Sequence, residues 1–326
     1  MPRKLALAHA PTPLWRNEAL DALIGAEVWV KRDDASAGAE AGNKIRKLEY
    51  LLAGALDRGA GTVITCGAAQ SNHARATAIL AASLGLRSVL FLRTPNPAEP
   101  PPILGNLLLD RMVGADVRFI TPAEYTRRGE VMAAAKTEIE HTGEPAYVIP
   151  EGGSNGLGSL GYVDAMGEVR EQLDLGIGGG PEPYDVVVHA CGSGGTAAGV
   201  ALGASHWKTA NSTLAVAVCD DRAYFEKVTA RIIAEARALE PTLGEPGPLV
   251  IDDRFKGPAY GVMSDEQLHF LVDIARRTGL ILDPVYSGKA LFALAHLDPK
   301  PKRVLFIHTG GLAGLLGVPE ALSGAI

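Results

Sequence analysis

The amino-acid sequence predicts an α/β protein of two domains, each built on a largely parallel sheet covered by helices. Short apolar runs alternate with longer amphipathic runs along most of the chain, which is the pattern of parallel strands joined by crossover helices. The chain has 326 residues, of which 47% are hydrophobic. That length exceeds what a single hydrophobic core usually organises, so we expect two domains rather than one.

The first series of predicted elements lies between residues 62 and 150. Short apolar runs predict strands, and the alanine-rich or amphipathic runs between them predict helices. The predicted strands are 62–67, 88–92, 116–120 and 147–150, and the predicted helices are 74–84, 103–112 and 124–141. The proline-rich stretch 94–102 is expected to be a surface loop, because proline has no N–H to donate to a ladder.

A second series begins near residue 156 and has the same alternation. The predicted helices are 160–173, 197–207, 223–239 and 265–278, and the predicted strands are 185–190, 214–219 and 304–308. Residues 186–207 contain no charged side chain and are long enough to span a bilayer. Gly192 to Thr196 interrupt this stretch, however, so we expect a strand, a glycine loop and a helix instead.

Composition argues against several classes of function. The chain carries 31 basic and 37 acidic residues, a formal net charge of −6, which disfavours nucleic acid or an anionic membrane as a partner. Its three cysteines, Cys66, Cys191 and Cys219, are widely spaced and form no C-x-x-C pattern. We therefore expect no disulfide framework and no metal site, and a reducing cytoplasmic location.

A glycine loop follows the strand predicted at 185–190. The sequence Gly192-Ser193-Gly194-Gly195-Thr196 ends a strand and opens a helix, so its N–H groups and hydroxyls can bind a phosphate. The pattern Gly192-x-Gly194-x-x-Ala197 also nearly matches a dinucleotide fingerprint, with Asp220 after the next strand. An NAD-dependent oxidoreductase is therefore an alternative on these residues alone.

A basic segment predicts a reactive lysine. In Gly42-Asn43-Lys44-Ile45-Arg46-Lys47, Asn43 suits a helix N-cap, and Lys44 and Lys47 would lie on one face of the helix. Repulsion between two ammonium groups lowers the pKa of one and makes it a better nucleophile, as a Schiff-base lysine requires. Cations are disfavoured at a helix N-terminus, and a bound phosphate would resolve that conflict.

Polar residues follow other predicted strands. Ser71-Asn72-His73 is either a capped helix start or a site for a substrate carboxylate. Three further hydroxyl-bearing segments, around Tyr260, at Tyr286-Ser287 and at Thr309, follow apolar runs. Ligands of open α/β sheets bind at the carboxyl ends of strands, so we expect these groups to border one site.

The segments Gly42–Glu49, Gln70–Arg75 and Asp283–Lys289 resemble pyridoxal-phosphate enzymes of the D-cysteine desulfhydrase and 1-aminocyclopropane-1-carboxylate deaminase family. The likeness runs from about Pro11 to about Gly317. The resemblance implies a fold-type II, tryptophan synthase β-like architecture, which is usually dimeric. It implies a large cofactor-binding domain of residues 1–46 and 155–326 and a small α/β domain of residues 47–154.

The resemblance also implies a role for each candidate residue. Pyridoxal phosphate would be bound to Lys44, and the catalytic residues would be Lys44, Ser71, Tyr260 and Tyr286. The phosphate would lie on Ser193, Gly194, Gly195 and Thr196, with help from Lys47, and Asn72 would bind the ring hydroxyl. The substrate would contact Ser71, Asn72, His73, Tyr260 and Tyr286, and the ring nitrogen would face Ser287 or Thr309.

Two departures from the deaminase pattern indicate the reaction. The chain has Ser287 where deaminase members carry glutamate, and His73 where they carry glutamine. A hydroxyl does not hold the ring nitrogen protonated as a carboxylate does, which suits α,β-elimination better than cyclopropane opening. We therefore expect a homodimeric carbon–sulfur lyase that converts D-cysteine to pyruvate, sulfide and ammonia. L-Cysteate sulfo-lyase and 1-aminocyclopropane-1-carboxylate deaminase remain alternatives, and the sequence leaves the enantiomer open.

Overall fold

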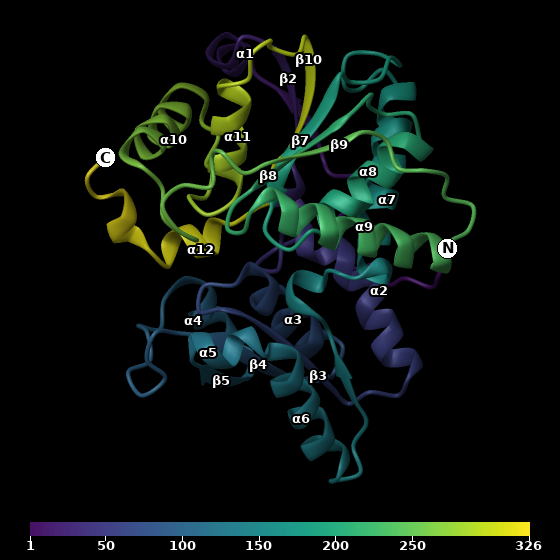
Figure 1. Cartoon of the computed structure of the whole chain (residues 1–326), viewed down its shortest axis with the longest axis vertical. Helices are drawn as coiled ribbons and strands as arrows, with labels where there is room; N and C mark the ends of the chain where they lie inside the picture. The colour runs from purple at the N-terminus through teal and green to yellow at the C-terminus, as the bar shows by residue number, and fades with distance from the viewer.

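The computed structural model describes residues 1–326 and contains two sheets, one above the other in Figure 1. The larger sheet has six strands in the order β1-β2-β10-β7-β8-β9, and the smaller has four in the order β5-β4-β3-β6. Every neighbouring pair is parallel except β1 with β2. The predicted α/β class with two mostly parallel sheets is confirmed.

The larger sheet is covered on both faces. Its strands are β1 (Leu14–Arg16), β2 (Glu27–Lys31), β7 (Val186–Cys191), β8 (Thr213–Ala217), β9 (Leu249–Asp252) and β10 (Arg303–Ile307). Its helices are α1 (Glu18–Ile24), α7 (Gly156–Asp174), α8 (Gly195–His206), α9 (Arg222–Leu239), α10 (Asp265–Thr278), α11 (Ser287–Ala295) and α12 (Leu312–Leu316). Helices α1, α10 and α11 share one apolar core with the sheet, and α7 and α8 share another on the opposite face.

The smaller sheet is also sandwiched. Its strands are β3 (Thr62–Ala68), β4 (Arg87–Arg93), β5 (Asp116–Ile120) and β6 (Ala146–Val148), and its helices are α2 (Asn43–Asp57), α3 (Asn72–Ser83), α4 (Gly105–Met112), α5 (Pro122–Thr126) and α6 (Arg128–Glu140). Side chains of β3 alternate: Val63 packs toward α2 and α3, and Ile64 packs toward α6. Period-two alternation lets one buried strand serve two helical layers.

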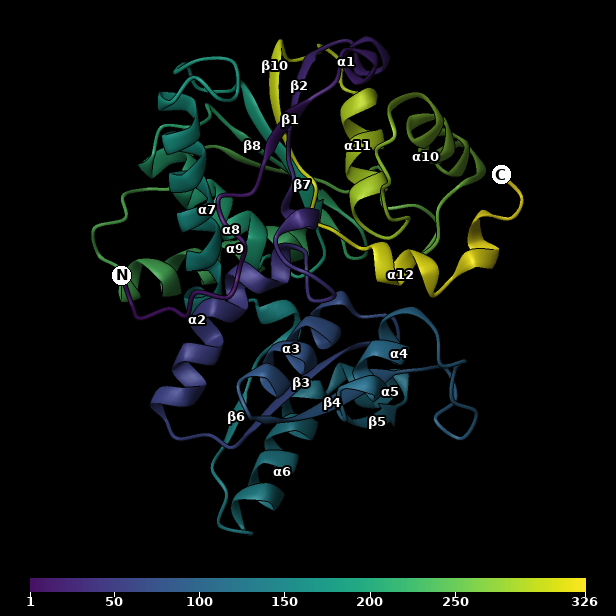
Figure 2. The ribbon, with the colours of Figure 1, turned by 180° about the vertical axis from the view of Figure 1, so that it is seen from behind.

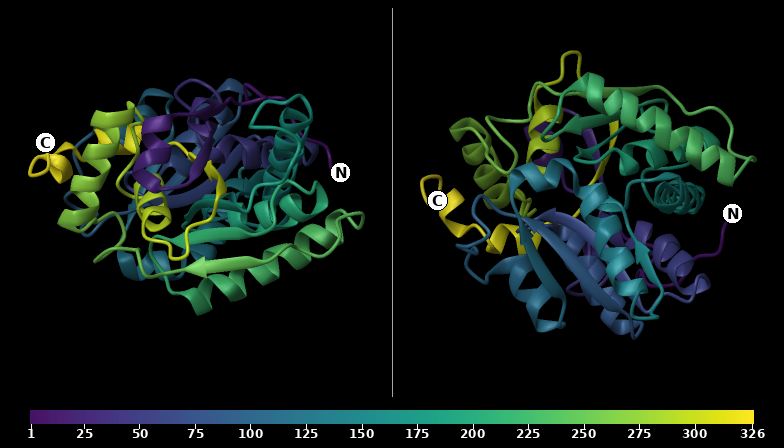
Figure 3. Two further views of the ribbon diagram at one scale, coloured as in Figure 1. Left: turned by 90° about the horizontal axis from the view of Figure 1, so that it is seen from above. Right: turned by 60° about the horizontal axis from the view of Figure 1, so that its bottom comes forward.

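Helix α2 joins the two halves of the molecule. It leaves the larger half beside α7, packs against α3 and leads into β3 (Figure 2). The chain returns through the short helix η2 (Glu151–Gly153) into α7. The two other short helices are η1 (Asp33–Ala35) and η3 (Pro319–Leu322), and the two chain ends lie on opposite sides of the molecule (Figure 3). The domain boundary predicted between residues 46 and 47 falls inside α2.

Most predicted elements are present. The strand 116–120 and the helix 265–278 have the predicted bounds. The single helix predicted at 124–141 is wrong, because α5 and α6 are separate helices that meet at Arg127. Asn43 is not the N-cap of α2; Gly42 occupies that position and Asn43 is the first helical residue.

The uncharged stretch 186–207 forms β7, a glycine turn and α8, as predicted. None of the helices combines the length and the apolar character that crossing a membrane demands.

Candidate active site

The start of α2 is tied to two other elements. Gly42 has φ of +124°, and a Cβ there would lie 2.9 Å from the carbonyl oxygen of Thr309, so only glycine fits. The backbone N–H of Asn43 donates to that same carbonyl at 3.0 Å, and its side-chain amide donates to Thr196 Oγ1 at 3.1 Å. The first turn of α2 is therefore held against the end of β10 and the glycine loop.

Lys44 faces a small cavity between these elements. The cavity is lined by residues from α2, α3, the glycine loop and the loops after β10 and before α11: Asn43, Lys44, Asn72, Ala190, Gly192, Ser193, Gly194, Thr196, Ala197, Tyr286 and Thr309. The Lys44 amine makes no hydrogen bond within the protein and no ion pair within 4 Å. Burial lowers its pKa to about 8, against attraction from Glu151. The amine is thus poised to act as a nucleophile and base near neutral pH.

The cause of this shift differs from the predicted one. Repulsion from Lys47 does not lower the pKa of Lys44; burial does. The repulsion acts on Lys47, whose pKa is lowered well below its usual value by burial first and by the charge on Lys44 second. The Lys47 ammonium donates to the carbonyl of Gly152 at 3.1 Å and to Ser154 Oγ at 3.2 Å.

The glycine loop is shaped to approach a ligand closely. Gly194 has φ of +82°, and a Cβ on Gly195 would lie 2.8 Å from the Lys47 amine. The N–H of Gly195 donates to Ser154 Oγ, whereas the N–H groups of Ser193, Thr196 and Ala197 donate to nothing in the protein. Free N–H groups at the start of a helix, beside a buried ammonium, form a site for an anion.

The turn before α3 places Asn72 in the cavity and the side chain of His73 outside it. Ser71 caps α3 by accepting from the N–H of Ala74 at 3.1 Å. The His73 imidazole points into the smaller half, where Nε2 contacts Thr65 Oγ1 at 2.9 Å. Burial, with the charges of Lys44 and Lys47, lowers the pKa of His73 well below its usual value, so the ring is neutral. Neither Ser71 nor His73 lines the cavity that Lys44 faces, and both lie at the start of α3.

Two tyrosines close the other side. The hydroxyl groups of Tyr260 and Tyr286 are 2.6 Å apart. Burial raises the pKa of Tyr260 to about 12, and burial with the neighbouring Tyr260 raises the pKa of Tyr286 well above 10. Both phenols are therefore protonated at neutral pH and able to donate. Gly192 makes room for Tyr286, since a Cβ there would lie 3.0 Å from the Tyr286 ring.

The two hydroxyls proposed for the ring nitrogen lie in different places. Ser287 is 1% exposed, and its hydroxyl donates to Asp283 Oδ1 at 2.5 Å. Thr309 lines the cavity with Lys44, and its side chain has no partner in the protein. Of the two hydroxyls, that of Thr309 therefore lies in the wall of the cavity.

Comparisons with known proteins identify the family of the chain. The pyridoxal-phosphate dependent enzyme family matches residues 5–310. The chain belongs to this family. The mitochondrial bifunctional D-cysteine desulfhydrase/1-aminocyclopropane-1-carboxylate deaminase of Arabidopsis thaliana is 43% identical over 322 residues, which cover 95% of this chain and 78% of that protein.

Two solved structures have a fold similar to that of this chain. The crystal structure of an ACC deaminase homologue has a TM-score of 0.90 at 34% identity and covers 100% of this chain and 97% of the other. The L-serine ammonia-lyase of the fungus Rhizomucor miehei has a TM-score of 0.66 at 17% identity, covering 99% and 100%, which is a likeness of fold alone.

As a pyridoxal-phosphate dependent enzyme, the chain takes the predicted cofactor, and the dinucleotide interpretation of the glycine loop falls. The residues present fit that group. Lys44 offers an amine without a partner, and the loop from Ser193 to Thr196 offers free N–H groups for a phosphate. The buried ammonium of Lys47 adjoins Gly195 in that loop.

Sequence reasoning missed two residues that support this site. Asn106 on α4 donates to Asn72 Oδ1 and to the carbonyl of Gln70, both at 2.9 Å, and so fixes the turn before α3. Ser154 links Lys47, Ser193 and the N–H of Gly195. It also missed Arg93, which lies outside this site and lines a larger, neighbouring cavity. The partners of Asn106 and Ser154 lie far from them in the sequence and become adjacent only in the fold.

Proposed function

We propose that the chain is a carbon–sulfur lyase that converts D-cysteine to pyruvate, sulfide and ammonia by α,β-elimination. The observation that carries the proposal is the unpartnered Lys44 amine, with its pKa near 8, beside a loop of free N–H groups and a pair of protonated tyrosines. The relative named for D-cysteine desulfhydrase, 43% identical, supports the substrate.

Backbone groups bind the substrate, and the Lys44 amine removes its Cα proton. The free N–H groups of Asn72 and His73 at the start of α3 receive the substrate carboxylate. When bound, pyridoxal phosphate supplies the electron-withdrawing ring that acidifies the Cα proton. The Lys44 amine takes that proton, because its lowered pKa keeps part of it neutral.

The tyrosine pair serves the leaving group. One of the Tyr260 and Tyr286 hydroxyls donates to the other, and the accepting hydroxyl keeps its own proton for the cavity that both residues line. That proton can hydrogen-bond the departing sulfur. The Cβ–S bond breaks with its electron pair on sulfur, and the enamine that remains hydrolyses to pyruvate and ammonia. We propose that Thr309, rather than Ser287, faces the ring nitrogen, because the Ser287 hydroxyl is already engaged with Asp283.

The test begins with borohydride reduction of the purified holoprotein and peptide mass mapping. We expect a phosphopyridoxyl group on the peptide that contains Lys44. The same preparation is then assayed for pyruvate and sulfide with D-cysteine and with L-cysteine. An unmodified Lys44 in cofactor-replete protein, or no pyruvate from either enantiomer, would overturn the assignment.

A deaminase that opens 1-aminocyclopropane-1-carboxylate is the second candidate, since the same relative carries that activity in its name. The ring-opened product would be 2-oxobutanoate instead of pyruvate. The carboxylate of Asp283, four residues before Ser287, already accepts from the Ser287 hydroxyl and from the backbone N–H groups of Val285 and Tyr286. This favours the lyase, and a product assay on both substrates decides between them.

We further propose a homodimer. Helices α4 and α12 pack against each other and leave four large apolar side chains exposed: Leu108 (43%), Met112 (71%), Leu312 (61%) and Leu316 (64%). Clustered apolar side chains of this kind mark an interface. Light scattering is expected to give a dimeric mass, and Met112→Lys with Leu316→Lys is expected to weaken the dimer.

The cytoplasm is our proposal for its location. Cys66, Cys191 and Cys219 are free thiols in the fold. Burial raises the pKa of each to about 12, so all three stay protonated. Proteins of oxidising compartments more often pair such residues. Fractionation of the native host with a cytoplasmic marker tests the location.

A further inference from the structure

A second, larger cavity opens beside Lys44 and holds an arginine. The cavity has a volume of about 450 Å³ and shares Asn72 and Tyr286 with the cavity that Lys44 faces. Arg93, the last residue of β4, lies in its wall together with Tyr260. Cysteine fills only a fraction of this space, so the cavity has room for a longer substituent beyond Cβ.

The charge of Arg93 is not compensated by the protein. No carboxylate lies within 4 Å of its guanidinium, and that group makes no hydrogen bond. Its contacts are the faces of two aromatic rings, Tyr125 at 4.9 Å and Tyr260 at 5.6 Å. Arg128 stacks on the same Tyr125 ring at 5.0 Å, but it also pairs with Glu151 at 2.8 Å. The stacking of Arg93 fixes its position and leaves its five N–H donors available.

The substrate carboxylate already has a place of its own. In the sheet, Arg93 lies opposite Ala68, and β3 and β4 are parallel neighbours. The chain leaves β3 at Ala68 and reaches the free N–H groups at the start of α3 within four residues. Two anion sites therefore lie at the carboxyl ends of adjacent strands, which are about 4.8 Å apart in a sheet. A substrate with one negative group would satisfy only the first.

We infer that Arg93 binds a second anionic group, a sulfonate or carboxylate on the β-substituent of the amino acid. The inference rests on the proposed lyase function and names an acidic β-substituted alanine as its substrate class. With cysteate the balance is simple: Lys44 takes the Cα proton, the Cβ–S bond breaks, and its electron pair leaves with sulfur as sulfite. No oxidant or reductant enters, and the enamine hydrolyses to pyruvate and ammonia as before.

The test compares turnover of two substrates, one with an anionic β-substituent and one with an uncharged β-substituent. Pyruvate release from cysteate and from β-chloroalanine, each as both enantiomers, is measured for the holoprotein and for Arg93→Gln. We expect kcat/KM for cysteate to fall roughly 10- to 100-fold, the scale of a lost charge-assisted hydrogen bond, and kcat/KM for β-chloroalanine to change less than about threefold. Arg93→Lys should restore part of the loss.

Arg118→Gln is the matched control. Arg118 is on the neighbouring strand β5, and its guanidinium lies over the Phe91 ring at 5.8 Å, outside the cavity. Neither substrate should be affected by its loss. An equal fall on both substrates in Arg93→Gln would overturn the inference, because Arg93 would then serve the carboxylate that they share. An unchanged rate with cysteate would overturn it too.

Calorimetric binding separates this inference from the proposed function. Cysteate and alanine are titrated into the wild-type holoprotein and into Arg93→Gln. We expect cysteate to bind the wild type at least about tenfold more tightly than alanine, and the difference to vanish in the variant. If that holds and neither cysteine nor cysteate releases pyruvate, the lyase proposal fails and the anion subsite stands. If cysteate binds no better than alanine, the subsite fails.

Discussion

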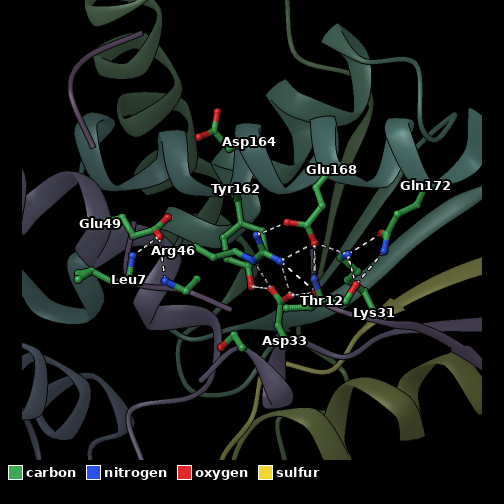
Figure 4. A network of polar contacts seen from close by, with 12 residues as sticks. Leu7, Thr12, Lys31, Asp33, Arg46, Glu49, Tyr162, Asp164, Glu168 and Gln172 are labelled. Atoms are coloured by element: carbon green, nitrogen blue, oxygen red, sulfur yellow. Dashed lines mark hydrogen bonds and ion pairs between the residues drawn. The ribbon is translucent and has the colours of Figure 1, made fainter. Parts of the chain in front are cut away.

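Arg46 and its two neighbours Lys44 and Lys47 lie within one turn of the same helix, but only Arg46 is paired with carboxylates. The Arg46 guanidinium is 4% exposed and fully occupied: it donates to both oxygens of Asp33, to both oxygens of Glu168 and to Thr12 Oγ1 (Figure 4). The attraction of Arg46 outweighs the burial of Asp33 and holds the pKa of that carboxyl below its usual value.

The network around Arg46 joins distant parts of the chain. Lys31 on β2 pairs with Glu168 on α7 and donates to Gln172 Oε1 at 2.6 Å, and Tyr162 donates to Asp33 at 2.6 Å. Two cations and two anions balance, and every one of them is hydrogen-bonded. On the other side of α2, Lys44 and Lys47 meet no carboxylate within 4 Å. The balanced charges therefore hold α2 in place, whereas the unbalanced ones create affinity for an anionic ligand.

The largest expected effect is that of Lys44→Ala. Without an amine to bind the cofactor and take the Cα proton, turnover should fall roughly 1,000-fold or more. Pyruvate release and borohydride trapping measure the loss, and circular dichroism checks that the fold is retained. Undiminished turnover would show that Lys44 is not the catalytic amine.

Arg46→Met should have the largest effect on stability. It leaves Asp33, which is 0% exposed, and Glu168 without their main partner, and stranding buried charges costs about 3–5 kcal/mol. Denaturant titration of the apoprotein gives the free energy of unfolding. The control is Arg231→Met, which removes the exposed pair with Glu235 and should cost under about 1 kcal/mol. Equal costs would mean that the network does not hold α2.

Lys47→Met tests the unbalanced side. The substitution removes a buried cation that has no counter-ion, so we expect the Kd for pyridoxal phosphate to rise about tenfold or more. The apoprotein should meanwhile keep or gain stability, because the penalty for burying that ammonium disappears. Fluorescence titration with the cofactor and denaturant titration of the apoprotein give the two numbers. If Lys47→Met destabilised the apoprotein as much as Arg46→Met does, Lys47 would also hold α2 in place, contrary to the argument above.

The sequence predicted the repeated units of this fold well, since parallel strands and their crossover helices carry strong local patterns. It missed elements with weak patterns. Strand β9 has four residues, and α11 begins inside a segment that looked like a polar turn. There the Asp283 carboxylate accepts from the N–H groups of Val285, Tyr286 and Ser287, which converts the turn into a helix start.

The site was predicted in its parts but not in its contacts. The motif around Lys44 and the glycine loop are each local, so their residue types could be read directly. The hydrogen bond from Asn43 to Thr196 joins residues 153 apart, and the partners of Arg46 lie up to 122 residues away. No local pattern shows such pairing, which is why the balanced half of α2 and the unpaired Arg93 emerged only with the structure.

The reactivity of the buried Lys44 amine should depend on pH differently from that of exposed lysines. A neutral amine is the reactive form, so a pKa near 8 means that labelling by an acylating reagent rises with pH to a midpoint near 8 in the apoprotein. Exposed lysines should follow at the usual value near 10.4. Glu151 attracts the charged form of Lys44, so Glu151→Gln should move the midpoint below 8. Peptide mass mapping after timed labelling gives both values, and a midpoint above 10 would refute the burial argument.

The last prediction compares the hydroxyl of Thr309, which has no partner in the protein, with that of Ser287, which is bonded to Asp283. Thr309→Val removes a group that lines the cavity, and we expect a shift in the absorption maximum of the bound cofactor with a fall in kcat of up to about tenfold. Ser287→Ala removes a hydroxyl held by Asp283, so it should lower stability by about 1 kcal/mol and leave the spectrum unchanged. The reverse pattern would show that Asp283 releases Ser287 when the cofactor binds, and the hydrogen bond between them would then belong to the cofactor-free protein alone.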